Sequence, residues 1–175
     1  ILGTKRLVKA RVKEIEYRRW RYSCMLYDGL SLYLDVVSDM KPIIWWEFAQ
    51  AQPTYFKKAA SVVSIMMNGQ PKSMQCNFNS DICKLCDARS RDNPRHIMFE
   101  CEALSNFREP IYQCIIQSMP LPMLQGYIEM TTDEKVKFLL SGISKEFFGV
   151  MKCVANYIFA LYTKRKEMYV EYEQM

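Results

Sequence analysis

Three cysteines and the only histidine of the 175-residue chain fall between residues 83 and 101. Cys83 and Cys86 have the C-x2-C spacing of a zinc knuckle, in which a tight turn brings two thiolates to one ion. His96 and Cys101 supply the other half of a C-x2-C-x9-H-x4-C pattern. Three thiolates and one imidazole form a closed structural zinc set that leaves no position for a reactive water. The spacing therefore predicts one structural Zn2+ held by Cys83, Cys86, His96 and Cys101.

The second half of the pattern also makes a geometric prediction. Five residues along an ideal helix rotate a side chain by about 140°. His96 and Cys101 therefore cannot both point at one ion from an unbroken helix. The helical turn "HIMFE" must end or distort before Cys101.

Two other interpretations of the cluster remain open. In the first, the cysteines are ordinary buried thiols and His96 is a surface histidine. In the second, Cys83 and Cys86 form a redox pair, although such a motif belongs at a helix start in a βαβ unit, which the sequence does not show. A metal site is favoured because it explains how the polar segment "DARSRDNPR", residues 87–95, is ordered with little core of its own.

The other cysteines indicate a reduced protein. Seven cysteines cannot all be paired, and a chain with 50% apolar residues needs no disulfide framework. We expect an intracellular protein, nuclear or cytoplasmic, that is cut from a longer chain, because it begins with Ile1 and shows no signal peptide. The most apolar segment, 147–162, is too short to cross a bilayer, so no membrane partner is expected. The four remaining cysteines are predicted to be small buried side chains: Cys24, Cys76, Cys114 and Cys153.

The net charge of +5 belongs to the N-terminus. Residues 1–22 carry eight basic and two acidic side chains, whereas the rest of the chain carries sixteen basic and seventeen acidic ones. This stretch either binds a polyanion along its length or is a solvated helical face. Tyr17 and Trp20 within it either stack on bases or pack in the core. Cations in the 83–101 loop either balance the metal centre or form a rim that faces phosphates. The candidate nucleic-acid-binding residues are Lys5, Arg6, Lys9, Arg11, Lys13, Arg18, Arg19, Arg21, Lys84, Arg89, Arg91 and Arg95.

Hydrophobic periodicity predicts a mainly α fold, a helical domain with a small inserted Cys3His zinc knuckle. A basic helix should run from Thr4 to the Asp28-Gly29 stop, and "SMQCNF" at 73–78 should be extended. Pro110 should begin a helix or kink one, and both Trp45 and Trp46 should lie in the core. The remaining expected helices cover 43–52, 55–67, and a segment that Thr131 and Glu134 cap and Ser141-Gly142 ends. A last, long helix should begin near residue 144 and carry apolar residues on one side: Phe147, Val150, Met151, Val154, Ile158 and Leu161. We divide the chain into a basic helix (1–29), a helical segment (30–72), the zinc knuckle (73–104) and a C-terminal helical segment (105–175).

Residues 66–113 resemble the region that follows the reverse transcriptase domain in non-LTR (LINE-type) retrotransposon polyproteins. The resemblance rests on the Asn68-Gly69 turn, Cys83-x2-Cys86, "HIMFEC" at 96–101, and a following helix with Leu104 and Arg108. "TTDEKVKFLLSG" at 131–142 and the basic residues 5–21 also look like that family. One departure is "RDNPR" at 91–95, where the family usually has a Glu-rich approach to the histidine.

The resemblance implies a segment that binds RNA template or target DNA during target-primed reverse transcription, with the rest of the parent polyprotein as a further partner. We do not predict an enzyme, because the chain has no Asp-Asp pair, no glycine-rich phosphate loop and no histidine beyond the metal ligand. No small-molecule substrate is expected either. The alternative is a protein-protein interaction module in which zinc is structural and the basic helix docks on an acidic partner.

Overall fold

A computed structural model of the chain describes residues 2–27, 30–37, 43–68 and 82–174. Helices dominate these ranges, and the described residues contain no strand beyond one isolated bridge between Ile82 and Arg91. The prediction of a mainly α fold is confirmed, whereas the predicted extended segment 73–78 and Cys76 lie outside the described residues. The α-helices are α1 (Leu2–Met25), α2 (Ser31–Val36), α3 (Ile44–Ala51), α4 (Phe56–Asn68), α5 (Ser105–Ser118), α6 (Leu121–Glu129), α7 (Thr132–Ser141) and α8 (Phe148–Glu173). Shorter helical turns are η2 (Pro53–Tyr55), η4 (His96–Glu100), η5 (Glu102–Leu104) and η6 (Lys145–Phe147).

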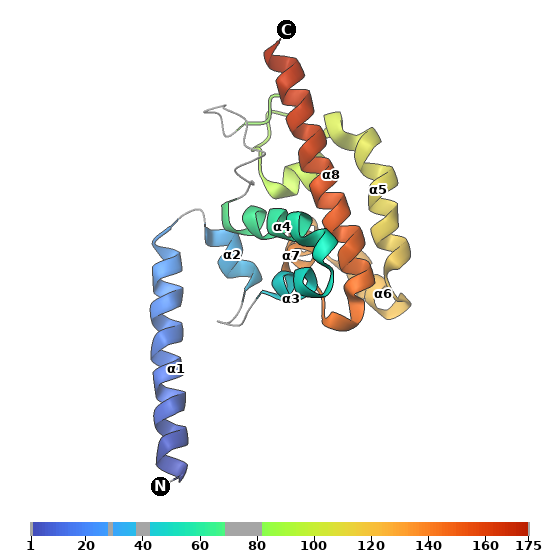
Figure 1. The fold of residues 1–175 in the computed structure, drawn as a ribbon. Coiled ribbons are helices and arrows are strands. Elements are labelled where there is room, and N and C mark those ends of the chain that lie inside the picture. Colours follow the sequence, from blue (N-terminus) through green and yellow to red (C-terminus); the bar gives the residue numbers. More distant parts are fainter. Residues whose placement is uncertain (1, 28–29, 38–42, 69–81, 175) are drawn as a thin grey trace.

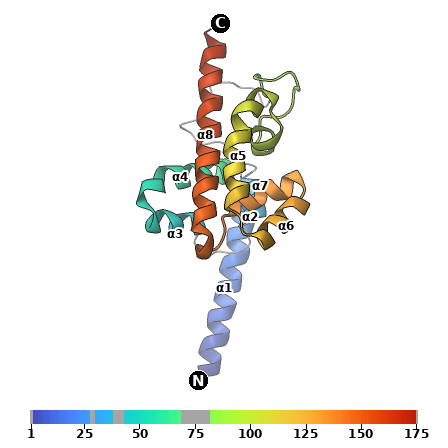
Figure 2. The ribbon, with the colours of Figure 1, turned by 90° about the vertical axis from the view of Figure 1, so that its right-hand side faces the viewer.

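The long helix α8 organises the core. It runs beside α5, with α3 and α4 on one flank and α6 and α7 on the other (Figure 2). Its inward face is buried at the spacing predicted from the sequence, because apolar residues three and four positions apart share one side of a helix. The buried residues of that predicted face are Val150, Met151, Val154, Ile158 and Leu161, with Phe147 half-buried at its start.

Helix α7 begins and ends where the sequence predicts. The Thr131 hydroxyl accepts the Glu134 N–H at 3.4 Å, and the Glu134 carboxylate accepts the Thr131 N–H at 2.8 Å, so the capping box is confirmed. Gly142 ends the helix with φ of 76° and ψ of 166°, a backbone region that only glycine adopts readily.

Replacing Gly142 with alanine is expected to lower the free energy of unfolding by about 2 kcal/mol or more. A Cβ there would collide with the side chain of Ile44 and press on Met151, in addition to the strained φ. Gly126 is the matched control, because a Cβ built inside α6 meets nothing within 4 Å. Gly126→Ala should stabilise the protein by about 0.5–1 kcal/mol in urea unfolding. Equal effects of the two substitutions would contradict the geometry.

The tryptophan pair is placed largely as predicted. Trp45 is fully buried and donates its indole N–H to the Leu140 carbonyl at 2.7 Å, which ties α3 to α7. Trp46 is half-buried, and its ring centroid lies 5.9 Å from that of Phe56. Pro110 does not begin a helix; it lies in the second turn of α5, where its missing N–H removes one backbone hydrogen bond.

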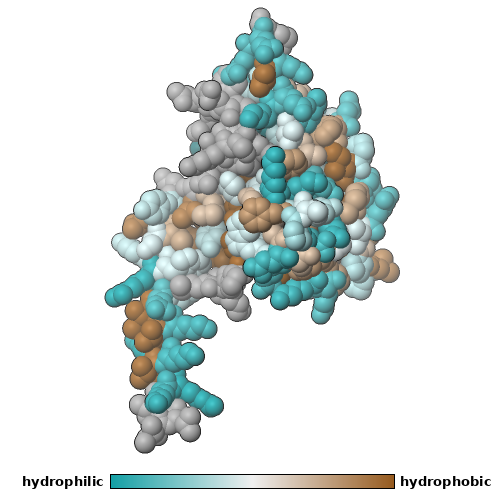
Figure 3. Space-filling model, in the orientation of Figure 1, coloured by the Kyte–Doolittle hydropathy of each residue, from teal (hydrophilic) through white to brown (hydrophobic). Residues whose placement is uncertain are grey.

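Helix α1 points away from the rest of the molecule (Figure 1). Its C-terminal end meets α2, where the rings of Trp20 and Tyr33 make an edge contact at 6.1 Å and Cys24 is buried. The apolar positions along the helix form a stripe that is 41–65% exposed, visible beside the hydrophilic side of the helix in Figure 3. The predicted helix is thus present, but its apolar stripe is not part of the core. The stripe consists of Val8, Val12, Ile15, Tyr22 and Leu26.

Candidate metal centre

The four predicted ligands come together in the structure. The sulfurs of Cys83, Cys86 and Cys101 and a ring nitrogen of His96 all lie within 4.8 Å of one another. Cys83, His96 and Cys101 are buried, and Cys86 is half-buried. This arrangement is a candidate Cys3His metal centre, and it contradicts the interpretation of His96 as a surface residue.

The first two ligands are positioned by a short antiparallel turn. The Ile82–Arg91 bridge closes it, and the Cys83 N–H donates to the Ser90 carbonyl at 2.9 Å. Arg89 reverses the chain with φ of 48°, a left-handed conformation that is uncommon for a non-glycine residue. The turn and the packing of Cys83, Leu85 and Cys86 against the hydrophobic core together hold the C-x2-C segment.

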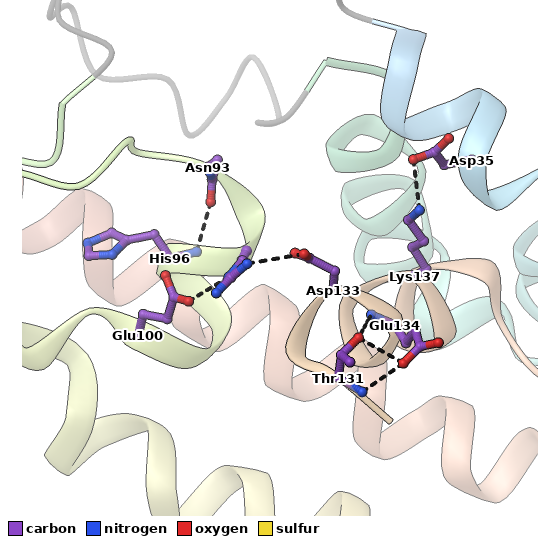
Figure 4. A network of polar contacts seen from close by, with 9 residues as sticks. Asp35, Asn93, His96, Glu100, Thr131, Asp133, Glu134 and Lys137 are labelled. Atoms are coloured by element: carbon purple, nitrogen blue, oxygen red, sulfur yellow. Dashed lines mark hydrogen bonds and ion pairs between the residues drawn. The ribbon is translucent and has the colours of Figure 1, made fainter. Parts of the chain in front are cut away.

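The other two ligands flank η4, a wide helical turn. Asn93 accepts the His96 N–H at 2.8 Å and so caps this turn (Figure 4). The Cys101 N–H donates back to the His96 carbonyl at 2.7 Å, after which Cys101 itself is extended, with φ of −60° and ψ of 115°. The expansion followed by an extended residue confirms the predicted break before Cys101. It turns the thiol and the imidazole toward the same point.

Two of the separations between donor atoms are close to those around a tetrahedral ion. Bonds of about 2.3 Å to sulfur and 2.0–2.1 Å to nitrogen place two sulfurs about 3.8 Å apart and a sulfur and a nitrogen about 3.6 Å apart. In the structure, Cys83 Sγ lies 4.0 Å from Cys101 Sγ, and Cys86 Sγ lies 3.4 Å from His96 Nε2. The chain thus holds these donors close to coordination geometry through its own fold.

Electrostatics explains why such a cluster favours a cation. The Cys101 thiol donates to the Cys83 sulfur, which lowers the pKa of Cys83 to about 4 and raises the pKa of Cys101. Burial raises the pKa of Cys101 further. One thiolate is therefore easy to form and the next is difficult, unless a positive ion compensates the added negative charge.

The imidazole of His96 has one nitrogen toward the sulfurs and one away from them. Nε2 lies beside Cys86, whereas Nδ1 is buried and has no hydrogen-bond partner among the described residues. A metal-bound histidine usually donates its second N–H to a carboxylate, carbonyl or water. His96 is thus positioned through its backbone and the surrounding packing within the described part of the chain.

A buried ion pair that was not predicted from the sequence connects the metal-binding segment, residues 83–101, to α8. Arg165 donates to both carboxylate oxygens of Asp92, from Nε at 3.2 Å and from Nη2, and the two side chains are only 3% and 8% exposed. Tyr169 donates its hydroxyl to Asp92 at 3.3 Å and accepts the Lys84 N–H at 3.1 Å. Burial raises the pKa of Tyr169 to about 12, so the hydroxyl remains a donor. A signal was present in the sequence, because Arg165 follows Ile158 and Leu161 on the apolar face.

The basic residues predicted to form a rim on the 83–101 loop differ in their surroundings. Arg95 is held by Glu100 at 2.5 Å and by Asp133 of α7 at 3.1 Å (Figure 4), so it joins the loop to the N-terminus of that helix. Its charge is thereby balanced within the protein. Arg89 and Arg91 are exposed on the turn, as is Lys84.

The basic residues of α1 that were predicted to contact nucleic acid are exposed along the helix. Glu14 pairs with Arg11 at 2.6 Å and with Arg18 at 2.5 Å, and Arg21 donates to the Tyr17 hydroxyl at 3.2 Å. The remaining basic side chains of this helix have no ion pair or hydrogen bond within the described part of the chain. These are Lys5, Arg6, Lys9, Lys13 and Arg19.

The predicted burial of the other cysteines is only partly correct. Cys24 is buried, but Cys114 is exposed on α5 and Cys153 is half-buried on α8. Their sulfurs lie 2.7 Å apart, because α5 and α8 pack side by side there. The proximity raises the pKa of Cys114 to about 11.

No helix in the described ranges combines the length and the apolar character needed to cross a membrane. Comparison of the chain with protein-family models, with curated proteins and with solved structures finds no match.

Proposed function

We propose that the chain is a nucleic-acid-binding segment, and the exposed basic surface of α1 is the observation that carries the proposal. Eight basic side chains face solvent along 24 residues of helix, and only two of them pair with a carboxylate among the described residues. A helix that extends away from the core can lie along a phosphate backbone over its full length. The structure describes no comparable run of basic residues elsewhere.

We further propose that Cys83, Cys86, His96 and Cys101 hold one structural Zn2+. Thiolate-rich tetrahedral sites favour zinc, and four protein ligands leave no open position for catalysis. The ion would fix the turn that presents Arg89 and Arg91. The proposed role is therefore non-catalytic, and the metal supports the shape of a binding surface.

The origin we propose for this segment is the C-terminal region of a non-LTR retrotransposon reverse transcriptase. The resemblance of residues 66–113 supports it, together with the Cys3His spacing and the capped helix α7 that follows. In that setting the segment would help the polymerase hold template RNA or target DNA during target-primed reverse transcription. A reverse transcriptase domain encoded directly upstream is the observation that would establish this origin.

Salt dependence of binding tests the proposal. Fluorescence anisotropy with labelled single-stranded RNA, structured RNA and duplex DNA should show an affinity that falls steeply with ionic strength. The triple variant Lys5→Gln, Lys9→Gln, Lys13→Gln should flatten the slope of log K against log salt by about 2, since each lost phosphate contact on a single strand contributes about 0.7.

The matched control removes three lysines that already pair with carboxylates on the protein. Lys137 pairs with Asp35, Lys145 with Glu47 and Lys164 with Glu167. Their replacement by glutamine changes the net charge equally and should leave the slope nearly unchanged. Absence of binding by the unaltered chain at low salt would refute the proposed function.

One observation favours a second function, a protein-interaction module. The exposed apolar stripe on α1 resembles the buried seam of a helix pair, and its flanks are basic. Binding of a synthetic acidic amphipathic helix, lost on Val12→Ser with Ile15→Ser, would support this function. The result counts against the first proposal only if RNA and DNA fail to bind.

A further inference from the structure

We propose a second nucleic-acid contact surface where the start of α4 crosses α8, formed by Lys57, Lys58 and Lys152 around aromatic rings. The inference rests on the proposed nucleic-acid-binding function and adds a site that residue spacing does not indicate. In Figure 3, hydrophilic side chains alternate with apolar ones over the crossing of these two helices. We assign this surface to a single-stranded polynucleotide.

Contacts across the crossing hold the three ammonium groups in place. Lys58 donates to the Asn156 side chain at 2.6 Å, and its Nζ lies 5.1 Å from the centre of the Tyr55 ring. Lys152 lies 6.0 Å from the centre of the same ring. Two cations are therefore gathered at one tyrosine, although they are 94 positions apart in the chain.

The third lysine extends this group of charges along α8. Lys57 lies 5.6 Å from the centre of the Phe159 ring. Residues 152, 156 and 159 are spaced by four and three positions, so they share one face of the helix. The aromatic rings attract the cations without neutralising their charge. The surface is thus held in position before any ligand arrives.

Carboxylates do not balance these charges within the part of the chain that the structure describes. Lys57 and Lys152 make only their ring contacts there, and the hydrogen bond of Lys58 goes to a neutral amide. By contrast, Lys137, Lys145 and Lys164 each have an acidic partner. Three uncompensated cations on one face form a local positive site, which is suited to consecutive phosphates.

An exposed aromatic ring at the start of α4 would select single strands over duplexes. Phe56 precedes Lys57 in the chain, is 59% exposed, and leans on the half-buried Trp46 with ring centroids 5.9 Å apart. An unpaired base can stack on such a ring while the lysines contact the adjacent phosphates. The bases of a duplex are already stacked on one another and cannot use it.

The test is the variant Lys57→Gln, Lys58→Gln, Lys152→Gln, measured on full chain loaded with zinc. Raising the salt concentration from about 50 to 200 mM lowers the affinity of the unaltered chain for a labelled single-stranded RNA. For the variant, the factor by which the affinity falls should be roughly 20 times smaller, which corresponds to about three lost phosphate contacts. Phe56→Ala should weaken binding of the single strand about tenfold and leave duplex binding unchanged. Circular dichroism verifies that each variant is folded.

The outcomes separate this inference from the proposed function. If the Lys5, Lys9, Lys13 variant loses affinity while the Lys57, Lys58, Lys152 variant binds like the unaltered chain, the second surface is refuted and the function stands. Equal losses for single-stranded and duplex ligands would refute the assignment to single strands. If the unaltered chain binds no nucleic acid, the function itself fails. A loss for the paired-lysine control equal to that of the new variant would also refute the surface.

Discussion

Replacing Cys83 with serine is expected to reduce the metal content from about one zinc per chain to none. Cys83 is buried, and its sulfur lies 4.0 Å from that of Cys101, so a hydroxyl at this position cannot complete the thiolate set. Because zinc binding is linked to folding, the free energy of unfolding should fall by more than about 4 kcal/mol. Inductively coupled plasma mass spectrometry and urea unfolding measure the two effects.

The loss of order that follows the loss of the metal should be largest in the metal-binding segment. Hydrogen exchange is expected to accelerate through residues 82–104, whose backbone is ordered by the turn, by η4 and by the hydrogen bond from Tyr157 to the Met98 carbonyl. The capping box and the Trp45 hydrogen bond also hold α7, so that helix should lose less protection than residues 82–104.

Cys114→Ser is the control for the metal prediction. Cys114 is an exposed cysteine outside the ligand set, so its replacement should leave the zinc content at one per chain. Unaltered chain that folds fully without any metal, with exchange in residues 82–104 unaffected by a chelator, would contradict the assignment of a structural metal.

Replacing Arg165 with methionine is expected to cost about 3–5 kcal/mol of unfolding free energy. The substitution leaves the Asp92 carboxylate 8% exposed and without its cation, and uncompensated buried charges are among the most destabilising defects in proteins. The hydrogen bond from Tyr169 compensates only part of that charge. Denaturant unfolding of zinc-saturated protein measures the loss.

A double substitution and a neighbouring residue provide the controls. Asp92→Leu with Arg165→Met removes both charges together, so it should recover a large part of the stability. Lys164→Met breaks only the exposed pair with Glu167 and should cost less than about 1 kcal/mol. If Arg165→Met costs no more than Lys164→Met, the buried pair does not fasten the loop to α8.

Features that depend on residues close together in the chain could be predicted from the sequence. The four ligands and the break before Cys101 follow from spacing, because a short turn and one helical turn leave few ways to present four donors to one point. The α7 cap follows from Thr131 and Glu134, which need only their own backbone. Periodicity also identified the buried face of α8, since burial on a helix repeats every three or four residues.

Features that depend on distant residues could not be predicted. Asp92 and Arg165 are 73 positions apart, Arg95 meets Asp133 across 38 positions, and Cys114 approaches Cys153 across 39. The expected burial of Cys114 was wrong because an apolar neighbourhood in sequence does not show that Cys114 meets Cys153 of α8 at a solvent-exposed position. Contacts of this kind depend on how the helices pack.

A mainly α chain with a Cys3His set, a capped helix and a basic N-terminal helix could thus be predicted from residue order, because all of these follow from short-range geometry and composition. The packing of the helices was needed to show that the α1 stripe lies outside the core, that Arg165 pairs with Asp92 of the metal-binding segment, and that Lys58 and Lys152 meet at Tyr55. Spacing along a helix defines which residues share a face. The packing of other helices determines whether that face is buried, paired or left to solvent.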